Sequence, residues 1–232
     1  MNSLEGKVTI VTGAKGGLGT YVTDSFLAAG AKVIGVSRSI QATDFGHPGF
    51  VAMPAELSTG AAAQKLTDEI VARFGRVDAL VHVMGGFAGG QSVAETDDAT
   101  FEKMLDLNYR AAFFIARAVL PQMRQQGCGR ILAVASRQAV EPAAMVGAYS
   151  ASKAALVSLI RTIALENKDR CISANTVMPG TMDTPGNRAG DPKADGSQWV
   201  HPSQVAAILV HLASDAGAQI TGAAIPIYGK QA

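Results

Sequence analysis

Cysteine is scarce in this sequence: only Cys128 and Cys171 occur among its 232 residues, with no CxxC pair and no histidine nearby at ligand spacing. A disulfide framework needs more cysteines, and a cysteine–histidine metal site needs ligands at short, regular spacings. The pattern therefore favours two reduced thiols in a cytoplasmic protein over a disulfide or a bound metal.

The sequence also lacks an excess of charge of either sign, because it has 20 lysines and arginines and 19 aspartates and glutamates. The basic residues are scattered rather than gathered in a run that follows phosphates, so nucleic acid is not an expected partner. No stretch reaches the roughly 18 consecutive apolar residues of a membrane span. The first residues lack the basic-then-apolar layout of a signal peptide. We expect neither a membrane segment nor a nucleic-acid surface.

Repeats, low-complexity tracts and linkers are absent as well, so residues 1–232, 48% of them hydrophobic, are expected to form one domain. Seven short runs are predicted strands: Val8–Thr12, Ala31–Val36, Phe50–Met53, Ala79–Val83, Arg130–Ala135, Ile172–Val177 and Ala223–Ile227. Five longer runs are predicted helices: Gly17–Ala29, Gly60–Phe74, Thr100–Gln126, Tyr149–Asn167 and His201–Ser214. The third helix is expected to break or bend around residues 108–112. This alternation predicts an α/β fold, a doubly wound parallel sheet with helices on both faces.

One segment, Asp183–Trp199, is rich in Pro, Gly, Asn and Asp and has few apolar residues. An ordinary surface loop has this composition, and so does a lid over a substrate site. A short substrate loop around residues 183–200 is therefore a hypothesis beside the plainer one.

The first predicted strand runs directly into a glycine cluster in which Gly13, Gly17 and Gly19 are spaced G-x-x-x-G-x-G. Glycine is needed where a pyrophosphate approaches main-chain N–H groups at a helix N-terminus. A tight turn alone is the simpler alternative. The place after the first strand of an α/β chain favours dinucleotide binding by this loop, which also contains Lys15 and Leu18.

Ser37 and Arg38 follow the second predicted strand, where an acidic residue would hydrogen-bond the ribose hydroxyls of NAD. The carboxylate is missing, and Arg38 with nearby Lys15 suits a 2′-phosphate, so the sequence favours NADP over NAD. The alternative is that Arg38 is only a solvated surface charge. After the third strand, Glu56 and Leu57 are placed to meet an adenine edge.

Tyr149 and Lys153 lie four residues apart in a predicted helix, so both side chains share one face. A neighbouring ammonium lowers the pKa of a phenol, as an acid/base group for an alcohol or carbonyl requires. Ser136 closes the fifth strand and would face the same crevice, although a lone serine there is often a helix cap. Asn108 interrupts a helical run, where an amide accommodates a kink or holds a water.

Together these residues resemble the short-chain dehydrogenase/reductase family over essentially the whole chain. The segment Thr12–Gly19 is similar to its cofactor loop, and Ser136, Tyr149, Lys153 and Asn108 match its catalytic residues in identity and spacing. The resemblance implies a Rossmann-like fold and roles for all four. Tyr149 would exchange the proton and Ser136 would hold the substrate oxygen. Lys153 would acidify Tyr149 and bind the nicotinamide ribose, and Asn108 would position a water.

Further cofactor contacts follow from the resemblance. Pro179, Gly180 and Thr184 look like the segment that meets the nicotinamide, and Gly85 belongs to the motif after the fourth strand. The resemblance also implies a homodimer or homotetramer with two-fold interfaces.

That motif departs from the family, which usually has Asn-Asn-Ala-Gly where this chain has His-Val-Met-Gly at residues 82–85. His82 is expected to take the structural role of the missing amide, tying neighbouring strands, rather than a catalytic one. The glycine-rich residues 83–90 and the late segments 182–188 and 194–199 look like those of dihydropteridine reductases. Those enzymes have an acid after the second strand and lack the serine, whereas this chain has Ser37, Arg38 and Ser136.

The sequence thus predicts an oxidoreductase that transfers hydride between NADP(H) and a carbonyl or alcohol of a small molecule. Reduction of a pterin, a catalytically silent nucleotide-binding regulator, and a lyase or isomerase on the same scaffold remain alternatives. Phe87, Met145, Met182 and Trp199 suggest a partly apolar pocket, but each is more readily ordinary packing than a substrate contact.

Overall fold

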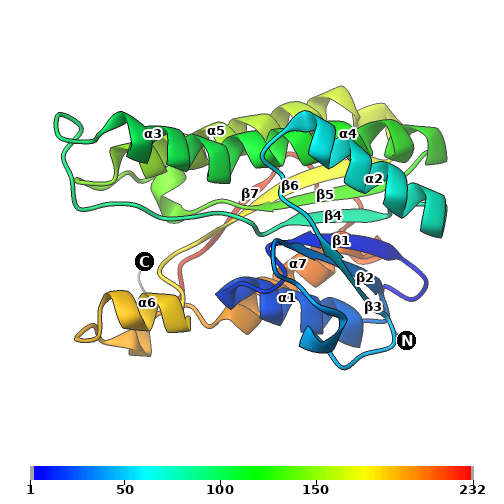
Figure 1. Cartoon of the computed structure of the whole chain (residues 1–232), viewed down its shortest axis with the longest axis horizontal. Coiled ribbons are helices and arrows are strands. Elements are labelled where there is room, and N and C mark those ends of the chain that lie inside the picture. Colours follow the sequence, from blue (N-terminus) through cyan, green and yellow to red (C-terminus); the bar gives the residue numbers. More distant parts are fainter. Residues whose placement is uncertain (1–2, 231–232) are drawn as a thin grey trace.

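The computed structural model describes residues 3–230 and contains one parallel sheet of seven strands (Figure 1). Their spatial order is β3-β2-β1-β4-β5-β6-β7. The strands are β1 (Val8–Thr12), β2 (Lys32–Ser37), β3 (Phe50–Pro54), β4 (Ala79–His82), β5 (Gly129–Val134), β6 (Ile172–Pro179) and β7 (Ala224–Ile227). Every pairing is parallel. The predicted doubly wound α/β fold is confirmed.

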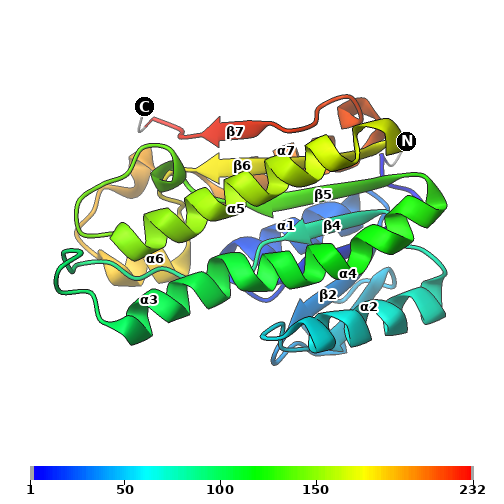
Figure 2. The same ribbon diagram turned by 90° about the horizontal axis from the view of Figure 1, so that it is seen from above.

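Helices cover both faces of the sheet (Figure 2). They are α1 (Gly17–Ala28), α2 (Gly60–Phe74), α3 (Asp98–Leu105), α4 (Ala111–Gln126), α5 (Gly147–Glu166), α6 (Pro185–Gly190) and α7 (Pro202–Ala213). Helices α1 and α7 pack side by side under one face, and α2, α4 and α5 cover the other. Along β1, Ile10 and Val11 are fully buried against opposite faces, as expected for a strand enclosed by two helical layers.

The long helix predicted over Thr100–Gln126 is divided in the structure. A π-helical segment, Asp106–Arg110, separates α3 from α4 and contains Asn108. The expected break is therefore present, two residues earlier than placed. A π-helical turn widens the backbone by one residue and often occurs at functional sites. It turns the Asn108 side chain into the protein, where it is fully buried.

The segment around residues 183–200 contains a short helix, which the sequence analysis did not predict. Helix α6 starts after Thr184, whose side chain accepts a hydrogen bond from Asn187 N at 3.3 Å. Proline at its first position is compatible with a helix start because proline has no N–H to satisfy. A parallel bridge between Met182 and Val200 closes the base of this segment.

The order of the strands fixes where a ligand can bind. The chain moves outward from β1 to β2 and β3, then returns to place β4 on the other side of β1. In such sheets the crevice lies outside the carboxyl ends of the strands, at this reversal. Within the described residues no helix has the length and apolar character needed to cross a membrane.

Candidate active site

A cavity of about 630 Å³ opens at the carboxyl ends of β1, β2 and β4. Of the predicted cofactor residues, its lining includes Gly13, Lys15, Gly17, Leu18, Gly19, Ser37, Arg38, Glu56, Leu57, Gly85 and Thr184. Met84, Leu107, Met182 and Asn187 also line it. Of these four, the sequence analysis considered only Met182, as a pocket residue. Pro179 and Gly180 lie at the end of β6, where Gly180 N donates to Ile227 O at 3.0 Å, and they are not part of the lining.

The glycine loop leaves no room for side chains. A Cβ on Gly19 would overlap Gly13 O, so the start of α1 rests directly on the loop backbone. Gly13 has φ +71°, and its Cβ would lie 2.8 Å from Met84 N after β4. The cradle therefore offers main-chain groups at a helix N-terminus to a ligand, as a dinucleotide pyrophosphate requires.

Basic residues surround the end of the cavity near β2. Lys15 N donates to Ser37 Oγ at 3.3 Å, and Lys15 Nζ lies 2.9 Å from Asp44 Oδ1. This pairing holds the pKa of Asp44 below its ordinary value. Asp44 is an acid close to the cavity that the sequence analysis missed, because it lies beyond the end of β2 in a short 3-10 turn. Arg38 is exposed and lines the cavity.

The predicted catalytic residues Ser136 and Tyr149 meet. Ser136 follows β5 and is buried, and the Tyr149 phenol is hydrogen-bonded to its hydroxyl. Ser136 Oγ also donates to Gln138 Oε1 and accepts from Gln138 N at 3.3 Å. Gln138 is therefore a member of the site that sequence reasoning missed, since only the 3-10 turn after Ser136 brings it back. The Ser136 side chain therefore caps the 3-10 turn and also hydrogen-bonds Tyr149.

The expected lowering of the Tyr149 pKa is wrong for this structure. Burial raises the pKa of Tyr149 above its ordinary value, and the hydrogen bond with Ser136 opposes this only in part. Desolvation disfavours the phenolate, and it is the larger effect here. Tyr149 is therefore a protonated phenol at neutral pH.

Lys153 lies one turn further along α5 and is almost completely buried. Its Nζ donates to Val134 O at 2.9 Å. Burial lowers the pKa of Lys153 to about 8, because removal from water penalises the ammonium. A Cβ on Gly85 would lie 3.1 Å from Lys153 Nζ and 2.8 Å from Asn108 Oδ1. Gly85 also lines the cavity, so it joins Lys153 and Asn108 to that cavity.

The side chain of Asn108 is held entirely by protein groups. Asn108 Oδ1 accepts from Gly86 N at 2.9 Å, and Nδ2 donates to Gly86 O at 3.0 Å and to Ser152 Oγ at 3.1 Å. Ser152 in turn donates to Tyr149 O at 2.7 Å. The π-helical segment is thus bonded both to the segment after β4 and to helix α5.

His82, the departure from the family motif, forms a contact between strands. Its Nδ1 lies 2.9 Å from Thr12 Oγ1 on the adjacent strand β1, and Thr12 Oγ1 accepts from Met84 N at 3.4 Å. This agrees with the expected structural role. Burial, with a smaller effect of the Lys153 charge, lowers the pKa of His82 to about 3. His82 is therefore a neutral imidazole inside the sheet.

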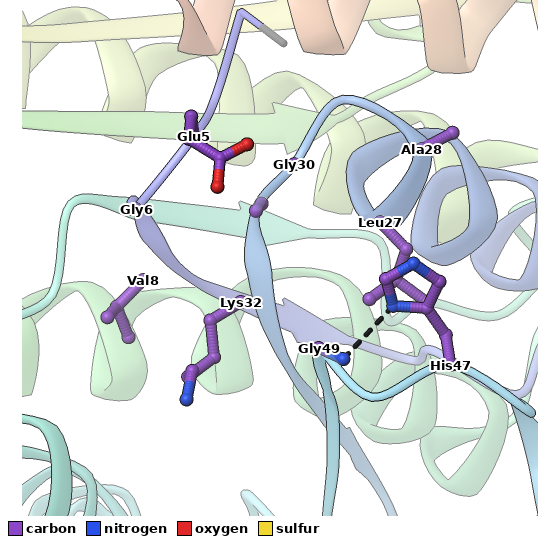
Figure 3. Close-up of a pocket in the computed structure, with 10 residues that line it drawn as sticks. Glu5, Gly6, Val8, Leu27, Ala28, Gly30, Lys32, His47 and Gly49 are labelled. Atoms are coloured by element: carbon purple, nitrogen blue, oxygen red, sulfur yellow. Dashed lines mark hydrogen bonds between the residues drawn. The ribbon is translucent and has the colours of Figure 1, made fainter.

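A second cavity, of about 440 Å³, lies at the opposite end of β1 and β2 (Figure 3). Its polar side chains are Glu5, Lys32 and His47, and His47 Nδ1 accepts from Gly49 N at 3.0 Å. None of the predicted site residues lines it. Among the described residues no cluster of three or more His, Cys, Asp or Glu side chains could hold a metal ion.

Comparison with known proteins gives consistent matches over nearly the whole chain. The family model for short chain dehydrogenases matches residues 7–194. D-threitol dehydrogenase of Mycolicibacterium smegmatis is 30% identical over 97% of this chain and 93% of its own length. The 3-oxoacyl-[acyl-carrier-protein] reductase of Salmonella typhimurium is 29% identical over 98% of both chains. The crystal structure of 3-ketoacyl-(acyl-carrier-protein) reductase from Brucella melitensis, complexed with NADH, superposes with a TM-score of 0.89 at 27% identity over 99% of both chains.

Proposed function

Because this chain belongs to the short-chain dehydrogenase/reductase family of oxidoreductases, we propose that it interconverts a carbonyl and an alcohol of a small molecule with NADP(H). The observation that carries the proposal is the hydrogen-bonded pair Ser136 and Tyr149, one helical turn from buried Lys153 and joined to the cofactor cavity through Gly85. A nicotinamide dinucleotide held in that cavity would supply the hydride.

The protein residues supply position, a proton and charge. Tyr149 donates its proton to the carbonyl oxygen in the direction of reduction, because a phenol whose pKa lies above its ordinary value is protonated at neutral pH. Ser136 holds the same oxygen after turning from Gln138. Lys153 carries a positive charge below about pH 8, which favours negative charge developing nearby. Asn108 holds the segment after β4 in place, because both polar atoms of its side chain hydrogen-bond the backbone of Gly86.

The preference for NADP rests on Ser37 and Arg38, which line the cavity just beyond β2. They stand at the position where an acidic residue would favour NAD. Lys15 supports it less than the sequence suggested, because the ammonium is paired with Asp44. The guanidinium of Arg38 suits a 2′-phosphate in geometry and charge.

Tyr149→Phe tests the proposal. The change removes one hydroxyl, so we expect reduction of carbonyl substrates, followed as NADPH absorbance at 340 nm, to fall by about 10²–10⁴-fold. NADPH affinity should not change. Tyr21→Phe, on the exposed face of α1, is the matched control and should keep full activity.

Substantial activity in Tyr149→Phe would show that another group exchanges the proton. Tight NADPH binding by the parent protein without oxidation of NADPH by any carbonyl in a broad panel would favour a nucleotide-binding regulator.

A further inference from the structure

Phe87 occupies an unusual position for a large apolar side chain. It lies in the glycine-rich segment Gly85–Gly90 after β4, and 68% of its surface is exposed. Its ring packs edge-to-face on Tyr149, with ring centroids 5.0 Å apart and planes at 74°. The sequence analysis treated Phe87 as ordinary packing, but a ring this exposed contributes little to a core. One side of the ring rests on the acid/base residue, and the rest is available to a ligand.

Neighbouring apolar groups extend this surface. Met145 is 46% exposed and Val93 is 80% exposed. A Cβ on Gly89 would lie 2.9 Å from both Phe87 Cζ and Val146 Cγ1, and a Cβ on Gly147 would lie 2.8 Å from Val93 Cγ2. The side chains of Phe87, Val93 and Met145 present only carbon, hydrogen and sulfur atoms. A polar or charged group placed against them would lose hydration without gaining a hydrogen bond.

The surface is also held in place. Gly90 N donates to Met145 O at 2.9 Å, which joins the segment after β4 to the segment before α5. Met145 has φ +66°, a conformation that non-glycine residues adopt only when their surroundings impose it. Gly90 has φ +94°, where a side chain would be strained. The aromatic ring is therefore part of a preformed wall rather than the tip of a free loop.

We propose that Phe87 is a specificity-determining residue and that the substrate is an aryl carbonyl compound, whose aromatic ring packs on the exposed part of Phe87. This inference rests on the proposed function, because Tyr149 and Ser136 fix where the carbonyl oxygen lies. A group attached to that carbonyl meets Phe87, which borders Tyr149 directly. Aromatic pairs favour edge-to-face or offset-stacked contacts, so a planar ring gains more there than a saturated ring of similar size.

Two ketones that differ only in the ring test the proposal: acetophenone and cyclohexyl methyl ketone. Their dissociation constants are measured by saturation-transfer NMR on the full chain with NADP⁺, which carries no hydride, so neither ketone is reduced during the measurement. We expect acetophenone to bind about two- to twelvefold more tightly, which is the range that one aromatic contact allows. Phe87→Ala should abolish this difference. Tyr21→Ala, at an exposed aromatic residue of α1 on the other face of the sheet, should keep it.

Equal binding of the two ketones, or a preference that survives Phe87→Ala, would overturn the proposal. Because Phe87 is mostly exposed, its replacement should leave the melting temperature unchanged. A Phe87→Ala protein that changes its oligomeric state, with no change in either ketone's affinity, would assign the ring to a subunit contact instead. Failure of the proposed function looks different: acetophenone would bind at Phe87, yet the parent protein would reduce neither ketone.

Discussion

At the scale of single residues, burial is the main influence on the pKa values of Lys153 and Tyr149. The sequence places an ammonium four residues from a phenol and suggests that charge sets the phenol pKa. In the fold both groups leave water, so the pKa of Tyr149 rises and the pKa of Lys153 falls to about 8. Each shift favours the neutral form of its group. At neutral pH Tyr149 is therefore a protonated phenol, and Lys153 is still an ammonium.

Cofactor preference is also decided by single residues. Arg38→Ala removes a guanidinium that lines the cavity beyond β2. We expect NADPH affinity to fall by roughly tenfold or more, because a charge-assisted phosphate contact is lost. NADH affinity should stay nearly constant. Titration of both nucleotides into parent and variant measures this, with Arg161→Ala on α5 as the control. Equal affinity of the parent for both nucleotides would refute the assignment to NADP.

His82 makes the stability of the protein depend on acid. Its pKa is about 3 when folded, against an ordinary value of about 6.5 in an unfolded chain. Between these values the unfolded state binds the extra proton, so the free energy of unfolding falls as the pH falls below 6.5. The loss reaches about 2 kcal/mol by pH 5. Urea unfolding at pH 7.5 and pH 5 should show this difference for the parent and a smaller one for His82→Asn.

Asparagine is the suitable replacement because its amide can still hydrogen-bond Thr12 Oγ1, which His82 contacts now. His211→Asn is the control, since His211 is exposed on α7. If His82→Asn and the parent lose the same stability on acidification, the buried imidazole is not the acid-sensitive group.

At the scale of elements, the backbone of the glycine loop at Gly13 packs directly against the backbone at the start of α1. Gly19→Ala would place a methyl group on top of Gly13 O, so the loop and the start of α1 must separate. Overpacking of this kind costs about 1–3 kcal/mol of stability. The shifted N–H groups should also bind NADPH more weakly.

Gly186→Ala in α6 is the matched control, because apart from its chain neighbours and the backbone of its own helix no atom lies within 4 Å of the position that its Cβ would take. We expect it to keep both the melting temperature and the NADPH affinity of the parent, as measured by thermal unfolding with and without NADPH. A Gly19→Ala protein that behaves like Gly186→Ala would mean that the loop yields without cost.

At the scale of the whole molecule, the helical layer formed by α3, α4 and α5 leaves apolar side chains exposed. Phe101, Phe113 and Leu165 belong to these three helices in turn. We propose that this layer packs against a second copy in a homodimer or homotetramer with two-fold symmetry. Light scattering at micromolar concentration should give a multiple of 23.9 kDa. A particle of 23.9 kDa alone would contradict the proposal.

Much of the architecture could be predicted because local patterns encode it. Apolar runs separated by amphipathic helices predicted the seven strands, and the parallel order followed from the crossover rule. The glycine spacing located the loop at Gly13–Gly19, and that loop lines the larger cavity. The identities and spacing of Ser136, Tyr149 and Lys153 located the candidate catalytic cluster, in which Ser136 and Tyr149 are hydrogen-bonded. These features depend on residues that act through their own backbone or through neighbours one turn away.

Only the tertiary structure decided which effect wins where distant segments meet. Sequence spacing cannot tell how far a side chain is removed from water, so it gave the wrong direction for the Tyr149 pKa. It could not pair Lys15 with Asp44, because a turn after β2 brings them together. Nor could it show that Phe87 is exposed beside Tyr149, since residues 62 positions apart in sequence meet only because β4 ends and α5 begins at the same edge of the sheet. Burial and long-range contacts are properties of the packed chain. They decide the pKa values and the neighbours of residues whose positions the local sequence pattern indicates.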